Sequence, residues 1–202
     1  MNRINISCVL ILLIFSSCKE KVKKAIVEES SPKMDQVTFR TDEENQKVDV
    51  LIDGDLFTSY IYDGKTPKPV LYPVITKSGT KITRGFPIEP LEGERVDHPH
   101  HVGIWFNYGD VNGLDFWNNS YAIKEEDIHK YGTINHREVT ETNAATGTLV
   151  ATANWDTSDN TTLLEETTEF SFSQEGDTRK IIRTTTLKAL EDVSFKDNKE
   201  GM

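Results

Sequence analysis

Polar and apolar residues alternate over long stretches of the chain after residue 36, and this period of two is typical of half-buried β-strands. Clusters of turn residues, such as Asp53-Gly54 and Ser78-Gly79, separate these stretches. The one stretch that indicates a helical turn is 123–129. The alternation predicts strands at 37–41, 47–52, 57–62, 132–140, 148–155, 163–173 and 179–190, with an edge or crossover segment at 70–72. Strands at this spacing predict an all-β fold, an antiparallel β-sandwich.

The segment from Arg95 to Trp117 interrupts the alternation and is rich in side chains that could form a functional site. It holds three of the five histidines and two of the three tryptophans. Imidazole titrates near neutrality, so acid–base chemistry at physiological pH is easiest in such a segment. We therefore expect the polar site of the protein here.

The sequence Asp97-His98-Pro99-His100-His101 leads into an apolar run, 102–106, that predicts the start of a buried strand. In an extended chain His98 and His100 would share one face, and Asp97 and His101 would share the other. Pro99 suits a strand entry or an edge. One imidazole beside a carboxylate is a candidate general acid or base. The alternative is that these histidines only hydrogen-bond backbone groups at a strand entry.

Metal binding is a second interpretation of the paired histidines. Structural and catalytic metal sites usually have three or four protein ligands, and each face of the segment supplies two. A third ligand would have to be His129, His136 or a carboxylate. The sequence names no particular metal and no cofactor.

Turn residues follow the histidines, and Asn112-Gly113 predicts a tight hairpin turn. The spacing of the oxygen-bearing side chains does not match a calcium loop. Aromatic faces in this segment suit sugar rings, although core packing is the alternative. The candidate ligand-binding residues are Trp105, Tyr108, Asp110, Asn112, Asp115 and Trp117.

The first 17 residues have the pattern of a bacterial lipoprotein signal. Arg3 precedes an apolar core at 9–15, too short to span a bilayer, and Ser16-Ser17 precedes Cys18, the expected lipidation site. The alternative is an ordinary secretory signal with an incidental cysteine. Because Cys8 would leave with the signal, no intramolecular disulfide is expected. This pattern predicts a protein of the bacterial cell envelope, lipid-anchored on the periplasmic or cell-surface side.

Composition divides the rest of the chain into a tether and one domain. Residues 18–36 are rich in lysine and glutamate and poor in apolar residues, as in a solvated linker. Residues 37–202 are long enough for a single core. The formal net charge is -10 and basic residues form no stripe, so we expect no nucleic-acid partner. Membrane contact is expected through the lipid anchor alone.

Four segments of the chain together resemble the bacterial family labelled PmoA-like, named for a methane oxygenase subunit. They are 68–74, 83–87, 97–106 and 109–117, and the resemblance extends over 48–202. Methane chemistry is set aside, because that enzyme subunit has several membrane-spanning helices and this sequence has none after the signal. The family's members continue with further strands after a segment like 195–201, so the resemblance implies a chain shortened at its C-terminus.

The resemblance implies a large sandwich akin to that of aldose mutarotases, in which histidines and a carboxylate on the concave sheet handle a sugar. By this likeness His98, His100 or His101 would supply the acid or hydrogen-bond donor, and Arg84 and Asp110 would orient the ligand. An incomplete sandwich would expose an unpaired edge.

The sequence is compatible with two function classes. The first is a carbohydrate-active envelope enzyme, an epimerase, hydrolase or lyase, with a catalytic set of Arg84, Asp97, His98, His100 and His101. The second is a non-catalytic glycan-binding lipoprotein, and a metal-dependent enzyme with histidine ligands is a further alternative. A small molecule or glycan is the expected ligand in each case.

Overall fold

The computed structural model of the protein describes residues 36–199. Almost all of its regular structure is β-strand, in two antiparallel sheets of four strands, which confirms the predicted fold class. Among the described residues no helix is long and apolar enough to cross a bilayer. The predicted signal peptide, Cys18 and the tether up to residue 35 lie outside the described residues.

The first sheet has the order β1 (Val37–Asp42), β2 (Lys47–Ile52), β3 (Asp55–Ile61), β4 (Val70–Leu71). Asp53 and Gly54 join β2 to β3 with φ angles of 54° and 90°. Two consecutive positive φ values are typical of a type I′ hairpin, whose twist matches that of the flanking strands. The predicted turn is therefore confirmed.

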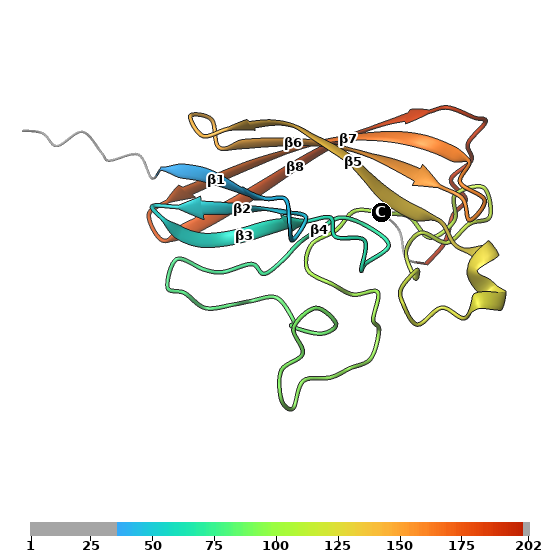
Figure 1. Ribbon diagram of the computed structural model, residues 1–202, viewed down its shortest axis with the longest axis horizontal. Helices are drawn as coiled ribbons and strands as arrows, with labels where there is room; N and C mark the ends of the chain where they lie inside the picture. Colours follow the sequence, from blue (N-terminus) through green and yellow to red (C-terminus); the bar gives the residue numbers. More distant parts are fainter. Residues whose placement is uncertain (1–35, 200–202) are drawn as a thin grey trace, which may run out of the picture. The chain divides into compact units, whose positions relative to one another are not determined.

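The second sheet is a meander of longer strands: β5 (Thr133–Asn143), β6 (Thr148–Asp156), β7 (Thr162–Glu175) and β8 (Thr178–Ala189). The predicted late strands match these four closely. A short 3-10 helix, η1 (Glu125–Lys130), precedes β5 where the sequence indicates a helical turn. In Figure 1 this sheet lies above the sheet of β1 to β4.

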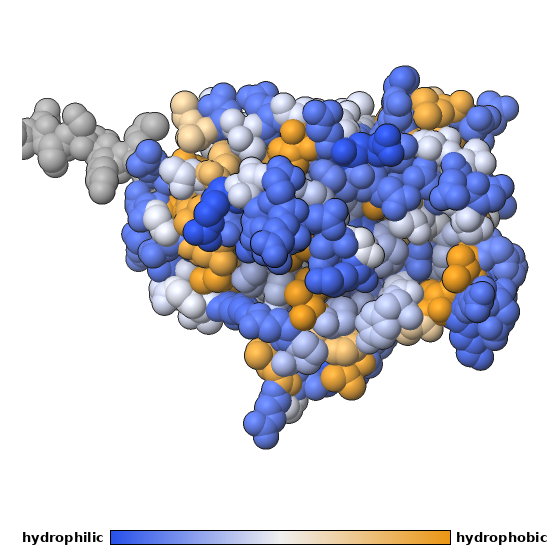
Figure 2. Space-filling view, in the orientation of Figure 1, coloured by the Kyte–Doolittle hydropathy of each residue, from blue (hydrophilic) through white to orange (hydrophobic). Residues whose placement is uncertain are grey.

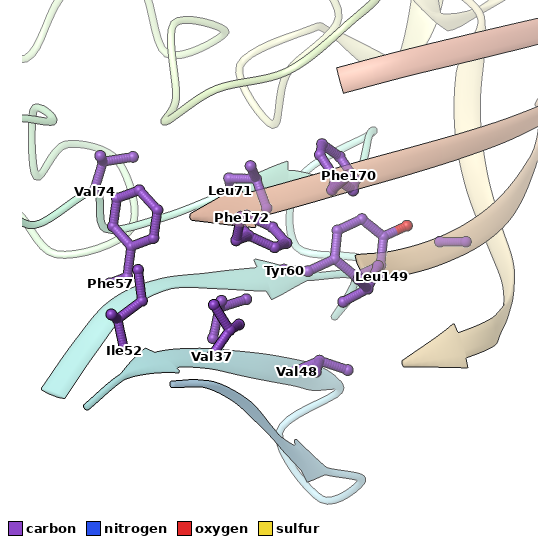
Figure 3. Packing of buried hydrophobic residues seen from close by; sticks show 12 residues of the cluster. Val37, Val48, Ile52, Phe57, Tyr60, Leu71, Val74, Leu149, Phe170 and Phe172 are labelled. Atoms are coloured by element: carbon purple, nitrogen blue, oxygen red, sulfur yellow. The ribbon is translucent and has the colours of Figure 1, made fainter. Parts of the chain in front are cut away.

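Aromatic rings from both sheets meet in the core between them. Phe57 of β3 meets Phe172 of β7 edge to face, with ring centroids 6.1 Å apart, and Tyr60 packs on Phe170 at 5.9 Å. Figure 3 shows these rings between the sheets, with Leu71 and Leu149 beside them. Alternate residues of β7 point into this core, as the period of two requires.

The other half of the β5–β8 sheet is covered by irregular chain. Val111 and Phe116 pack there on Trp155 and Leu164 in a second buried cluster. These residues belong to the long segment that joins β4 to η1, so one face of the large sheet is covered partly by the small sheet and partly by this segment. The same segment carries the histidines.

The predicted strand at 102–106 is wrong. The segment makes one isolated bridge, in which Leu71 and Ile104 exchange backbone hydrogen bonds of 2.9 and 3.0 Å. Gly103 has a φ of 56°, which a regular strand does not contain. The run is apolar because Val102 packs in a small cluster with Val70 and Tyr72. Burial of Val102 contributes to the strand-like signal, whereas Ile104 is exposed.

Part of the segment between β4 and η1 projects away from both sheets (Figure 1). Figure 2 shows hydrophobic side chains on this projection at the bottom of the view, whereas the surface over the sheets is mostly hydrophilic. The exposed large hydrophobic residues of the projection are Ile82, Ile88, Leu91 and Val96.

Candidate functional site

A tight turn gathers the three histidines. Pro99 follows His98, and the backbone amide of His101 donates to the carbonyl oxygen of His98 at 2.9 Å. Proline suits the second position of such a turn because its ring presets φ. The rings of His98 and His101 are stacked, with centroids 5.1 Å apart, and His100 lies 4.3 Å from His101. The predicted alternation of faces is therefore wrong, because the chain turns here and is not extended.

The side chain of Arg84 holds this turn by hydrogen bonds to the backbone carbonyls of the turn. Its Nη2 atom donates to the carbonyl oxygens of Asp97 and His98 at 2.8 and 2.9 Å, and its Nε atom donates to Phe86 O at 3.2 Å. The Nη1 atom lies 3.3 Å from Asp97 Oδ1. A planar guanidinium with several donors can satisfy this many carbonyls at once. The structure therefore makes Arg84 a positioning residue for the histidine turn.

Asp97 and His98 form a carboxylate–imidazole pair, with Oδ2 and Nδ1 3.1 Å apart. Desolvation raises the pKa of Asp97, but the hydrogen bond from His98 and the charge of Arg95 outweigh it and hold the pKa below its usual value. An ionised carboxylate accepts the Nδ1 proton, which leaves Nε2 of His98 as the basic nitrogen. This pair has the arrangement of an oriented general acid or base.

His100 lies deeper than its two neighbours. Desolvation, with smaller contributions from His101 and Lys68, lowers its pKa to about 4. The ring is therefore neutral at physiological pH and can both donate and accept one hydrogen bond.

Trp105 and Trp117 extend the cluster of rings. Their centroids are 5.8 Å apart at an interplanar angle of 66°, and His101 stacks on Trp105 at 5.8 Å. Both indoles are half-buried, and they line a shallow hollow of about 310 Å³ together with residues 103–104 and 106–107. The hollow offers aromatic surface directly beside the histidine turn.

The other predicted ligand-binding residues take part in local structure. Asp110 Oδ1 accepts from the amide of Gly113, and Asp115 accepts from the amides of Trp117 and Asn118. Asn112 has a φ of 55° in the confirmed type I′ turn between Val111 and Leu114, and its side chain bonds the backbone of Asp192 and Ser194. Tyr108 packs against Phe195 with centroids 5.3 Å apart. The structure does not bring these four side chains into the ring cluster.

Lys68 is a site residue that the sequence analysis did not single out. It is only 2% exposed, its Nζ donates to Trp117 O at 2.9 Å, and the ammonium lies 5.3 Å from the centroid of Trp105. Burial lowers its pKa to about 7, against the opposing charge of Asp115. The signal that could have found it is a lysine two residues before the buried Val70, on the same face of an extended chain.

The two remaining histidines lie away from the turn. His129 is exposed on η1, and His136 of β5 lies with its Nδ1 atom 3.1 Å from the hydroxyl of Tyr60. Within residues 36–199 no group of three or more His, Cys, Asp or Glu side chains is placed to hold a metal ion.

A family of unknown function (DUF6807) matches residues 47–202, and the chain belongs to this family. The predicted membership of the PmoA-like family is therefore wrong, and the roles carried over by that resemblance lose their basis. The shared motif positions had suggested it, but short motifs do not define a family. No curated protein and no solved structure matches the chain.

Proposed function

We propose that this member of the DUF6807 family is a carbohydrate-active protein of the bacterial cell envelope, which binds a sugar against Trp105 and Trp117 and exchanges a proton with it through His98. The observation that carries the proposal is the continuous cluster of rings in which an oriented Asp97–His98 pair adjoins an aromatic hollow.

The hollow suits a sugar ring. Indole faces pack well against the apolar C–H faces of a pyranose, while the N–H and the neighbouring imidazoles remain for its hydroxyls. Trp105 and Trp117 meet edge to face, so they present two walls at an angle. A volume of about 310 Å³ falls at the lower end of the range of small-molecule sites.

The histidine turn supplies the proton chemistry. Asp97 orients His98, and Arg84 fixes the backbone that carries both residues. In the proposed step Nε2 of His98 takes a proton from a substrate carbon or hydroxyl, or returns one to it, as in an epimerase, lyase or hydrolase. Neutral His100 would donate a hydrogen bond to the substrate, or accept one from it, without changing charge.

The cell-envelope part of the proposal rests on the sequence alone. The lipoprotein signal over 1–17 and Cys18 is the supporting pattern. Mass spectrometry of the protein expressed in a bacterial host tests it, because a diacylglyceryl group on Cys18 would appear as a mass increase. A mature chain that begins elsewhere, or an unmodified Cys18, would contradict it.

The catalytic test compares His98→Gln with His129→Ala, a matched histidine variant on exposed η1. Oligosaccharides cut from plant and bacterial polysaccharides are incubated with the whole protein, and products are followed by NMR. We expect His98→Gln to lower kcat by at least about 100-fold with little change in KM, as for loss of a general acid or base, and His129→Ala to have no effect. Full turnover by His98→Gln would reject the proton-transfer role.

Non-catalytic glycan binding is the second candidate, and one observation favours it. The residues that line the aromatic hollow include no titratable side chain. Saturable glycan binding that shifts the side-chain NMR signal of His101 and that Trp117→Ala abolishes, with no product from any glycan after long incubation, would establish this candidate in place of the enzyme. A His101 shift that is unchanged in Trp117→Ala would reject both.

A further inference from the structure

A second hollow lies along β5, away from the aromatic hollow. Its volume is about 1200 Å³, above the usual range of small-molecule sites. Residues 133–142 of β5 form one wall, and the turn between β1 and β2 and the segments 64–69 and 119–128 contribute the others. The space is large enough for an extended ligand of several units.

Tyr62 and His136 lie together in this hollow. Their ring centroids are 4.0 Å apart at an interplanar angle of 32°, and the hydroxyl of the buried Tyr60 lies 3.1 Å from Nδ1 of His136. Burial raises the pKa of Tyr60, so the phenol keeps its proton and can donate to Nδ1. Burial also lowers the pKa of His136 to about 4, so the ring is neutral. When the phenol donates to Nδ1, the proton of the neutral ring is on Nε2, which can then donate a hydrogen bond to a ligand.

A β-bulge supports the placement of His136. The register of β5 against β6 shifts between His136 and Glu138, and again between Val139 and Glu141. Bulges re-aim side chains and are common beside functional sites.

The lining side chains fit a neutral, hydroxyl-rich ligand. The lining includes amide and hydroxyl side chains, for example those of Gln46, Asn119 and Thr133. Lys68 is buried and bonded to Trp117, so the exposed charges of the lining are Lys65 and Arg137 against Glu43, Glu138 and Glu141. A lining with so small a net charge gives little advantage to an anionic or cationic ligand.

An added peptide strand is the other ligand that an edge strand suggests, because β5 is at the edge of its sheet. The two bulges break the regular spacing of backbone donors and acceptors on which strand addition depends. Exposed charges at Arg137, Glu138 and Glu141 also oppose strand pairing. The structure therefore favours the hydroxyl-rich ligand.

We propose that the hollow along β5 is a second carbohydrate-binding site, which holds a neutral oligosaccharide against Tyr62 with a hydrogen bond from Nε2 of His136. This site does not depend on the chemistry of the histidine turn. Two segments, 65–68 and 119–121, line both this hollow and a small cavity beside His100. These segments therefore separate the hollow along β5 from the histidine turn.

The test uses the whole protein with neutral hexasaccharides of glucose, xylose or mannose, with hexagalacturonate, and with an unstructured peptide of β-branched residues. Histidine side chains are labelled, and each signal is assigned from the matching His→Gln variant. We expect at least one neutral hexasaccharide to shift the His136 signal in a saturable manner. Binding of only hexagalacturonate or only the peptide at His136, or no shift with any of them, would overturn the proposal.

Variants separate this site from the aromatic hollow. Tyr62→Ala should weaken the His136-linked binding by about tenfold or more, as expected for loss of one aromatic contact, and Tyr62→Phe should retain it. Trp117→Ala should leave it unchanged. Tyr62 is half-buried, so its replacement by alanine could also disturb packing. Tyr121 also lines the hollow and is 63% exposed, so Tyr121→Ala leaves the core intact. We expect Tyr121→Ala to weaken binding several-fold. Loss of the His136 shift in Trp117→Ala, or full affinity in both tyrosine-to-alanine variants, would contradict a separate site.

Discussion

The ammonium group of Lys68 donates a hydrogen bond of 2.9 Å to the carbonyl oxygen of Trp117, 49 positions along the chain. The bond ties the residues before β4 to the end of the segment that carries the histidines. Lys68 is almost completely buried, and the charge of Asp115 raises its pKa against the effect of burial. A group whose charge depends on pH therefore ties the residues before β4 to Trp117 of the aromatic hollow.

Lys68→Met should change how stability depends on pH. The pKa of Lys68 is about 7 in the folded protein against 10.5 when exposed, so between these values the unfolded chain binds more protons than the folded one. Stability then rises with pH across this window, by up to about 1.4 kcal/mol per pH unit from this one group. We expect urea unfolding at a series of pH values to show a shallower rise in Lys68→Met than in the native protein. Parallel curves would mean that Lys68 is not desolvated as described.

Arg84→Gln should release the histidine turn. The variant loses charged hydrogen bonds to the carbonyls of Asp97 and His98, and we expect it to lower the free energy of unfolding by about 1–3 kcal/mol. The side-chain NMR signals of His98 and His101 should shift, while that of His136 should not. Arg137→Gln, at an exposed position of β5, is the control. Unmoved His98 and His101 signals in Arg84→Gln would show that the turn holds without Arg84.

Gly103→Ala should be strongly destabilising. Gly103 has a φ of 56°, and a Cβ atom there would lie 2.3 Å from the carbonyl oxygen of Leu71. Gly176→Ala is the matched control, since its φ is 59° and a Cβ atom would meet nothing within 4 Å. The control should cost about 1–2 kcal/mol from backbone strain alone, and Gly103→Ala clearly more. Equal losses in thermal unfolding would show that the segment moves away from Leu71 without cost.

Glu166→Gln should expose the cost of a buried charge. Arg183 donates to Glu166 Oε1 at 2.7 Å between the rings of Phe106 and Phe170, and burial lowers the pKa of this guanidinium. Removing the carboxylate charge leaves the arginine unpaired, so we expect a loss of about 3 kcal/mol in denaturant unfolding.

The double variant Glu166→Gln with Arg183→Met is the control for the Glu166→Gln prediction. It should recover part of the lost stability, because no unpaired charge remains in the core. A double variant less stable than Glu166→Gln would contradict the assignment of the loss to an unpaired Arg183.

The pattern of the sequence by itself determined the strands and tight turns. The alternation over 148–155 and 163–173 reproduces β6 and β7 because each strand is buried on one face and solvated on the other. Asn112-Gly113 determined its own turn, since two positive φ values are a local requirement. The concentration of histidine and tryptophan between Arg95 and Trp117 also located the candidate site.

Only the tertiary structure decided how that site is built. In the run 102–106, Val102 packs against Val70 of β4 and Phe106 packs against Trp155 of β6, and burial by distant chain carries the same signal as a strand. Arg84, Lys68 and His136 act through partners far away in the sequence, and no local pattern encodes those contacts. The hollow along β5 likewise forms where four separate segments meet. The alternation of polar and apolar residues and the conformation of tight turns depend on neighbouring residues, whereas buried charges and cavities depend on how the whole chain packs.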